Sequence, residues 1–215
     1  MTIGGVPLIV VMKISPIFDL LVICLGIFIW ITFERVGAYK KKRMDRVAFM
    51  EEIRNALAKN KYESAIEYCA NENKPLANMV KVGLMNRHRS PEDIAELMEA
   101  TRMGERVGLE KFLGILGTMG NSSPFIGLLG TVIGIIRAFK LLEHAGAGGA
   151  TTIMVGIAEA LVTTAMGLLV AIPCVIAFNY FMGVVKNWYV EMEVVSKELM
   201  VELVSGGKAK AVKKA

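Results

Sequence analysis

The sequence predicts an all-α integral membrane protein with three transmembrane helices. Hydrophobic residues make up 54% of the 215 residues, and charged residues only 21%. Of the 25 basic and 20 acidic residues, all but six lie in two stretches, 34–111 and 186–215. A soluble domain keeps a wet face on every helix or strand, so its charges are spread along the whole chain. The distribution therefore excludes a simple soluble domain, a disordered chain and a disulfide scaffold.

Three apolar runs are long enough to cross a bilayer, which takes roughly 20 helical residues. We expect transmembrane helix one at 14–33, helix two at 112–140 and helix three at 153–185. The third run is longer than a bilayer requires, so this helix should tilt or protrude at one end. Residues 1–13 contain a short apolar stretch that cannot span, and we expect an external segment lying along the membrane–water boundary.

Lysine and arginine set the predicted orientation. They concentrate in 34–111 and 186–215, whereas the other side of the membrane has few basic residues. We therefore expect an N-terminus outside the cytoplasm, a cytoplasmic helical domain at 34–111, an external turn at 141–152 and a cytoplasmic C-terminus. A cleaved signal peptide is the alternative for the N-terminal region, but no basic segment precedes the apolar run and no A-x-A-like site follows it.

The charged block reads as helices, and one start is well marked. Ser90 and Asp93 form a start resembling a capping box, with Pro91 in the first turn. Helical spacing continues from there into span two, so we expect one long helix that leaves the membrane. Span three should likewise continue as a cytoplasmic helix extension with a basic tail at 186–215. The simplest interpretation of these charged faces is a solvated surface, and a specific partner site is the alternative. Attraction to anionic membrane lipid is enough to explain the tail.

Nothing in the sequence predicts an enzyme. Cys24, Cys69 and Cys174 form no C-x-x-C pair, and His88 and His144 have no companion at ligand spacing. Walker A, G-x-S-x-G and zincin patterns are missing from the sequence. We expect no catalytic residues, no metal, no cofactor and no nucleic-acid partner.

Small residues crowd spans two and three. In lipid, such residues let helix backbones approach closely. Packing within one chain accounts for some of them, and their number suggests packing between chains as well, so we expect a homo-oligomer. The predicted helix-packing residues are Gly120, Gly127, Gly130, Gly134, Gly156 and Gly167.

Polar side chains inside these spans are the candidates for an ion path. A charged side chain at the bilayer centre costs about 2.5–3.5 kcal/mol on insertion scales, so Glu159 should face protein or water rather than lipid. A glutamate that only satisfies backbone groups is the alternative, and a threonine in a span often bonds to its own helix. The candidates for the proton pathway or channel lining are Glu159, Thr131, Thr164 and Thr163, and the candidate helix kinks are Pro124 and Pro173.

Two segments carry a family resemblance. SPFIGLLGTVIGIIRAF at 123–139 and GIAEALVTTAMGLLVAIPCVIAFNYF at 156–181 resemble the paired signatures of the ExbB/TolQ/MotA proton-channel family. The layout of three spans, a large block after the first and a short outer turn between the last two is similar as well. MotA-type members have a further span, so the chain resembles ExbB and TolQ more closely.

The resemblance implies a pentamer in the bacterial inner membrane, with spans two and three lining a central channel. It implies a single-span ExbD/TolR-like partner that carries a membrane aspartate, and a TonB/TolA-like protein that passes force to the outer membrane. Thr131, Glu159 and Thr164 match the family pattern, whereas Thr163 stands where other members often have alanine. A gliding-motility motor and a purely structural membrane scaffold remain alternatives. A small-solute transporter would predict internal repeats, which are not evident.

Overall fold

The structure is a computed structural model that describes residues 2–3, 6–7, 16–142 and 149–212. Most of the predicted interfacial segment and the centre of the predicted external turn lie outside these residues. The chain divides into two compact units. We call Met1–Arg35 with Phe112–Phe181 the apolar unit, and Val36–Lys111 with Met182–Ala215 the charged unit.

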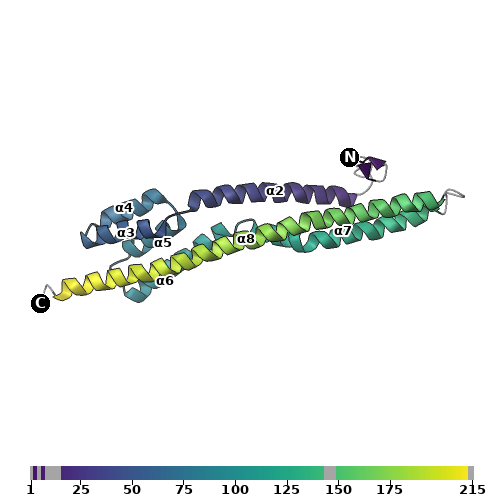
Figure 1. Cartoon of the computed structure of the whole chain (residues 1–215). Helices are drawn as coiled ribbons and strands as arrows, with labels where there is room; N and C mark the ends of the chain where they lie inside the picture. The colour runs from purple at the N-terminus through teal and green to yellow at the C-terminus, as the bar shows by residue number, and fades with distance from the viewer. Residues whose placement is uncertain (1, 4–5, 8–15, 143–148, 213–215) are drawn as a thin grey trace. The chain divides into compact units, whose positions relative to one another are not determined.

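The described residues are almost all helical, as the sequence predicts (Figure 1). Three helices among them are long and apolar enough to cross a membrane, and they correspond to the three predicted spans. Two two-residue strands, β1 and β2, pair antiparallel near the N-terminus. The helices are α2 (Pro16–Lys42), α3 (Arg46–Ala58), α4 (Tyr62–Glu72), α5 (Pro75–Met85), α6 (Pro91–Leu109), α7 (Leu113–Leu142) and α8 (Gly149–Val212).

In the apolar unit, α7 and the first half of α8 lie side by side and run antiparallel (Figure 1). The first half of α2 packs against them through a small core of Leu21, Val170 and Cys174. Many large apolar side chains of this unit point outward, among them Phe125 at 72% and Leu161 at 62% exposure. Such an apolar outer surface suits lipid or another apolar partner and does not suit water.

The charged unit has a core of the kind found in soluble helical domains. Its buried residues come from α3, α4, α5 and α6 and from the second half of α8. Gly83 of α5 lets two helices approach closely, because a Cβ there would lie 2.6 Å from Met98 Sδ and 2.9 Å from Leu199 Cδ2. The Ser90 side chain accepts a hydrogen bond from the Asp93 N–H, so α6 begins with the predicted cap.

Ion pairs fix α8 against the other helices of this unit. Glu198 of α8 accepts from Arg46 and Arg54 of α3, both at 3.1 Å. Arg102 of α6 is 8% exposed and pairs with Glu193 of α8 at 3.1 Å. The Arg102 guanidinium also lies 4.1 Å from the centre of the Tyr189 ring. Hydrogen bonds from Lys197 and then Arg102 lower the pKa of the Glu193 carboxyl, which keeps this contact charged.

The long helix expected from residue 90 into span two is interrupted. The helix α6 ends at Leu109, α7 begins at Leu113, and Phe112 between them has a left-handed φ of 66°. The Phe112 ring lies 5.4 Å from the Trp30 ring and 5.6 Å from the Arg35 guanidinium. On the charged side of the break, the Tyr39 hydroxyl donates to the Leu109 carbonyl at 2.8 Å. Tertiary contacts with α2 thus accompany the break.

Candidate functional site

Spans two and three meet along a row of small residues, which we call the α7–α8 seam. We define the seam by the glycines at which a Cβ atom, if one were added, would contact the facing helix. At Gly134 this Cβ would lie 2.8 Å from Ala160 Cβ, and at Gly156 it would lie 2.6 Å from Ala138 Cβ. At Gly167 it would lie 2.7 Å from the Ser123 carbonyl oxygen. At these positions only hydrogen leaves room for the neighbouring helix.

Thr163 lies inside the seam. It is 4% exposed, and a Cβ added at Gly130 would lie 2.3 Å from its Cγ2. Its hydroxyl donates to the Glu159 carbonyl at 3.3 Å, one turn back on the same helix. The side chain therefore has its methyl group against α7 and its hydroxyl on backbone.

Thr164 connects the two helices. Its hydroxyl donates to the Gly127 carbonyl at 3.0 Å. A Cβ at Gly127 would lie only 3.1 Å from Thr164 Cα and 3.1 Å from the Thr163 carbonyl oxygen. Because Gly127 has no side chain, α8 can approach α7 closely there, and the Thr164 hydroxyl reaches the Gly127 carbonyl.

Glu159 lies at the edge of the seam. It precedes Ala160, which contacts Gly134, and its side chain is partly exposed. Among the described residues its carboxylate has neither a hydrogen-bond nor an ion-pair partner. Thr131 follows Gly130, which faces Thr163, so the Thr131 and Glu159 positions lie within about two turns along the seam.

The Thr131 hydroxyl is turned to its own helix, where it donates to the Leu128 carbonyl at 2.7 Å. Nearby, the hydroxyl oxygen of Ser123 is buried and has no hydrogen-bond partner among the described residues. The residue after it, Pro124, supplies no N–H to the helix, and Pro173 has the same effect in α8, although both helices continue through the prolines. Ser123 and Thr131 of α7 thus lie along the same stretch of the seam as residues 159–167 of α8.

Sequence reasoning missed the burial of Arg35. It served only as one of the basic residues that set the orientation, yet it is 4% exposed, pairs with Glu34 and lies over the Phe112 ring. The partner ring is far away in the sequence, so no local pattern could reveal this contact. Glu159 and Arg35 differ in this respect, since only the arginine has partners in the described chain.

The sequence also matches a family description. The MotA/TolQ/ExbB proton channel family matches residues 71–194, which is more than half of the chain and includes the whole seam. The chain belongs to the MotA/TolQ/ExbB proton channel family. It is accordingly a multi-pass membrane protein of a channel family, and its three apolar helices agree with that membership.

Individual relatives match the chain over shorter segments. The Tol-Pal system protein TolQ of Pseudomonas aeruginosa is 44% identical over 90 residues, 42% of this chain and 39% of that protein. The biopolymer transport protein ExbB of Aquifex aeolicus is 40% identical over 90 residues, 42% of this chain and 61% of that protein. The aligned region thus spans less than two thirds of each of these relatives.

A solved structure has the same fold. The alignment to the structure of C. jejuni MotAB covers 94% of this chain and 82% of that chain, with a TM-score of 0.58 and 22% sequence identity. At this identity the likeness concerns the fold alone.

Proposed function

We propose that the chain is an inner-membrane proton-channel subunit of the stator or motor type. The observation that supports this most directly is the position of Glu159 beside the threonines of the seam, with a carboxylate that has no partner among the described residues. An ionisable group inside an apolar span is energetically costly and is retained where it faces a channel or another protein. The family match over residues 71–194 supports proton movement as the process served.

The proposal includes a ring of chains and a separate proton carrier. The apolar outer surface of α7 and α8 suits contacts between copies, and a pentamer is the assembly that we propose. Span two has no acidic residue, and span three has only Glu159. A single-span ExbD/TolR-like partner with a membrane carboxyl group would complete the path. The N-terminus would be periplasmic and the C-terminus cytoplasmic, as the basic residues indicate.

In this mechanism the chain acts on the charge of the partner. A hydroxyl that donates to a carboxylate favours its ionised form, and loss of that donor favours protonation. Thr131 and Thr164 would supply such donors once movement frees their hydroxyls from the Leu128 and Gly127 carbonyls. One elementary charge crossing 100 mV releases about 2.3 kcal/mol, enough to exchange one hydrogen bond of this kind. Force would then pass to a TonB/TolA-like protein.

The decisive variant is Glu159→Gln, produced together with the partner subunit. We expect it to abolish proton-driven function, measured as proton uptake by right-side-out membrane vesicles and as outer-membrane uptake or detergent resistance in cells. Glu96→Gln is the matched control, because Glu96 is exposed in α6 and has no partner among the described residues. Native mass spectrometry should give the same oligomer for both variants.

A structural membrane scaffold is the competing function. It predicts that Glu159→Gln changes the oligomer mass and leaves proton flux per assembled ring unchanged, and this result would refute the ion-path role. If the chain belongs to a gliding motor of the same family, the wild-type protein should still take up protons in vesicles. It also predicts that deletion of the gene stops surface movement without affecting nutrient uptake or detergent resistance.

A further inference from the structure

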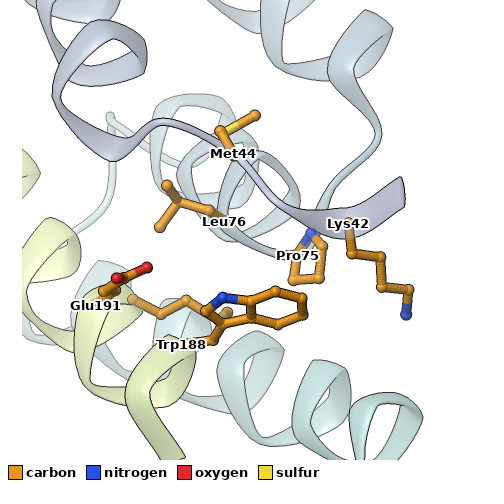
Figure 2. Close-up of a pocket in the computed structure, with 7 residues that line it drawn as sticks. Lys42, Met44, Pro75, Leu76, Trp188 and Glu191 are labelled. Carbon is orange, nitrogen blue, oxygen red and sulfur yellow. The ribbon is translucent and has the colours of Figure 1, made fainter. Parts of the chain in front are cut away.

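Polar groups that water reaches from outside need no partner within the protein, and a hollow in the charged unit is an example. Lys42, Trp188 and Glu191 are among the residues around it, and part of it is open to solvent (Figure 2). The Ser123 hydroxyl in the apolar unit differs. Ser123 is 1% exposed, and its hydroxyl oxygen has no hydrogen-bond partner among the described residues. Such a hydroxyl is costly in an apolar medium, so it points to a small polar ligand.

A second polar group without its usual partner lies in the preceding turn. In an α-helix, the carbonyl of residue 120 accepts a hydrogen bond from the N–H of residue 124. Residue 124 is proline, which has no N–H, so the Gly120 carbonyl lacks this donor although α7 continues through Pro124. Gly120 is buried against α8, because a Cβ there would lie 2.6 Å from Val175 Cγ2. Water from outside therefore cannot replace the missing donor.

Helix geometry brings these two groups close together. Side chains of a helix lean towards its N-terminus, so the Ser123 hydroxyl lies over the turn that carries the Gly120 carbonyl. A serine hydroxyl in a helix can donate to such a carbonyl directly, but the Ser123 hydroxyl does not. A water molecule bridges polar groups that do not meet directly, and buried waters make about three hydrogen bonds each. A water that accepts from Ser123 and donates to the Gly120 carbonyl would satisfy both groups.

This position continues the row of polar groups in the α7–α8 seam. The Thr164 hydroxyl donates to the Gly127 carbonyl. Ser123 lies one turn before Gly127, about 6 Å along α7, and its carbonyl oxygen faces Gly167 of α8. Glu159 lies in the opposite direction along the seam. A water held at Ser123 would therefore extend the row from Glu159 and Thr164 towards the start of α7.

We propose that Ser123 and the Gly120 carbonyl bind a water molecule inside the membrane, and that this water relays protons along the seam. It takes up a proton on its oxygen as hydronium and releases another of its protons, so the water is regenerated and no bond of the protein changes. The relay rests on the proposed channel function, whereas the water site does not. If no water is bound, the hydroxyl only lowers stability, and its removal should stabilise the protein.

The first test is thermal unfolding of the full-length protein in detergent, followed by circular dichroism. Ser123→Ala should lower the midpoint by about 2–4 °C, because the bridging water loses one of its partners. In a Pro124→Ala background, the N–H of residue 124 can reach the Gly120 carbonyl and the water loses its acceptor. There Ser123→Ala should leave the midpoint unchanged or raise it. The matched control is Ser122→Ala, at a partly exposed neighbour, which should not depend on the Pro124 background.

Contact with water can also be measured directly. In protein that carries isotope-labelled serine and is reconstituted in lipid bilayers, solid-state NMR detects which side chains receive magnetisation from water. The Ser123 signal is identified by its loss in Ser123→Ala. We expect this signal to receive magnetisation from water although the residue is buried, and we expect Pro124→Ala to reduce the transfer.

The relay is tested by proton uptake into right-side-out membrane vesicles that contain the partner subunit. Ser123→Ala should lower the flux about tenfold, because hydronium loses one charge-assisted hydrogen bond at this position. Ser122→Ala should transport protons as the wild type does. Native mass spectrometry should give the same oligomer for both variants, so a changed flux does not reflect failed assembly.

Three results would each overturn the proposal. One is a Ser123→Ala variant that is as stable as the wild type or more stable, and another is a Ser123 signal that receives no magnetisation from water. The third is normal flux in Ser123→Ala when Glu159→Gln abolishes it, which would refute the relay and leave the channel function standing. Normal flux in Glu159→Gln would instead refute the channel function, and the stability and NMR measurements would still decide whether the water is bound.

Discussion

The Thr164 hydroxyl on α8 donates to the Gly127 carbonyl on α7 at 3.0 Å, and this hydrogen bond directly joins the two spans of the candidate ion path. The bond needs the close approach that Gly127 permits, with Gly167 Cα only 3.2 Å from the position of a Cβ there. A hydroxyl that holds two helices together can leave its carbonyl only if the helices move or a stronger acceptor arrives. The contact therefore connects helix packing to the chemistry of the site.

Thr164→Val should separate these two roles. The valine keeps the size of the side chain and loses the hydrogen bond, which in membrane proteins contributes about 0.6 kcal/mol on average. We expect a small loss of thermal stability in detergent, together with a loss of proton flux that far exceeds it. Thr164→Ser keeps the hydroxyl, so it should retain both the thermal stability and the proton flux of the wild type. Thr118→Val is the control, since the Thr118 hydroxyl donates only to its own helix, at the Gly114 carbonyl. If proton flux is unchanged in Thr164→Val, the Thr164 hydroxyl only helps the two helices to pack and is not part of the proton path.

A second prediction concerns the tightest contact of the seam. Gly130→Ala should destabilise the apolar unit by about 1–3 kcal/mol, because the new Cβ would lie 2.3 Å from Thr163 Cγ2. Thr163→Ser removes this methyl group and should rescue the alanine variant in a double-mutant cycle. Thermal unfolding in detergent measures both effects.

Gly104→Ala provides the contrast to Gly130→Ala. No atom lies within 4 Å of a Cβ added at Gly104, which is exposed in α6. Alanine is favoured over glycine in a helix interior by about 1 kcal/mol, so this variant should be more stable than the wild type. Equal effects of alanine at Gly104 and Gly130 would contradict the packing explanation.

The break between α6 and α7 predicts which of two substitutions at Phe112 gives the more stable protein. Phe112→Ala and Phe112→Gly both lose the contacts with Trp30 and Arg35, but only glycine accepts the φ of 66° without penalty. We expect the glycine variant to be the more stable of the two by about 1 kcal/mol, as the cost of a left-handed residue suggests. An uninterrupted helix would favour alanine, so unfolding curves of the two variants decide between the two backbones.

The thiol of Cys69 gives a pH-dependent prediction. Burial in the core of the charged unit raises its pKa from 9.0 to about 12. The unfolded chain therefore releases this proton at lower pH than the folded chain does. The contribution to stability is complete below pH 9 and declines as pH rises towards 12.

Alkylation kinetics measure this effect directly. In a Cys24→Ala/Cys174→Ala background, maleimide labelling of Cys69 at pH 8.5 should be at least about 100-fold slower in the folded protein than in denaturant. Equal labelling rates would show that the thiol is accessible and that its pKa is ordinary.

The three spans could be predicted because each depends on a long local run of apolar residues. The start of α6 was predictable for a similar reason, since Ser90 and Pro91 act within one helical turn. The interruption at Phe112 was not, because the residues around it favour helix locally. The rings and charges that contact Phe112 come from α2, and a single sequence does not reveal such pairings.

The candidate site was predicted by residue type more than by arrangement. Helical periodicity places Thr163 near the stripe of Glu159 and Thr164 on its flank. In the structure, both threonines contact α7, one through its methyl group and the other through its hydroxyl. Periodicity describes one helix, whereas the rotation of α8 towards α7 depends on both helices together. The orientation of Glu159 within an assembly remains a prediction.

Along the α7–α8 seam, two of the close contacts lie seven residues apart on each helix. Gly127 and Gly134 meet Gly167 and Ala160 in opposite order. A repeat of seven is slightly shorter than two helical turns, so two helices that follow it wind around each other with a left-handed supercoil. We expect two helices wound in this way to keep similar axis spacing along the seam, so that a tilt of one is shared by the other. We therefore expect a displacement that begins at one level of the seam to move both helices together.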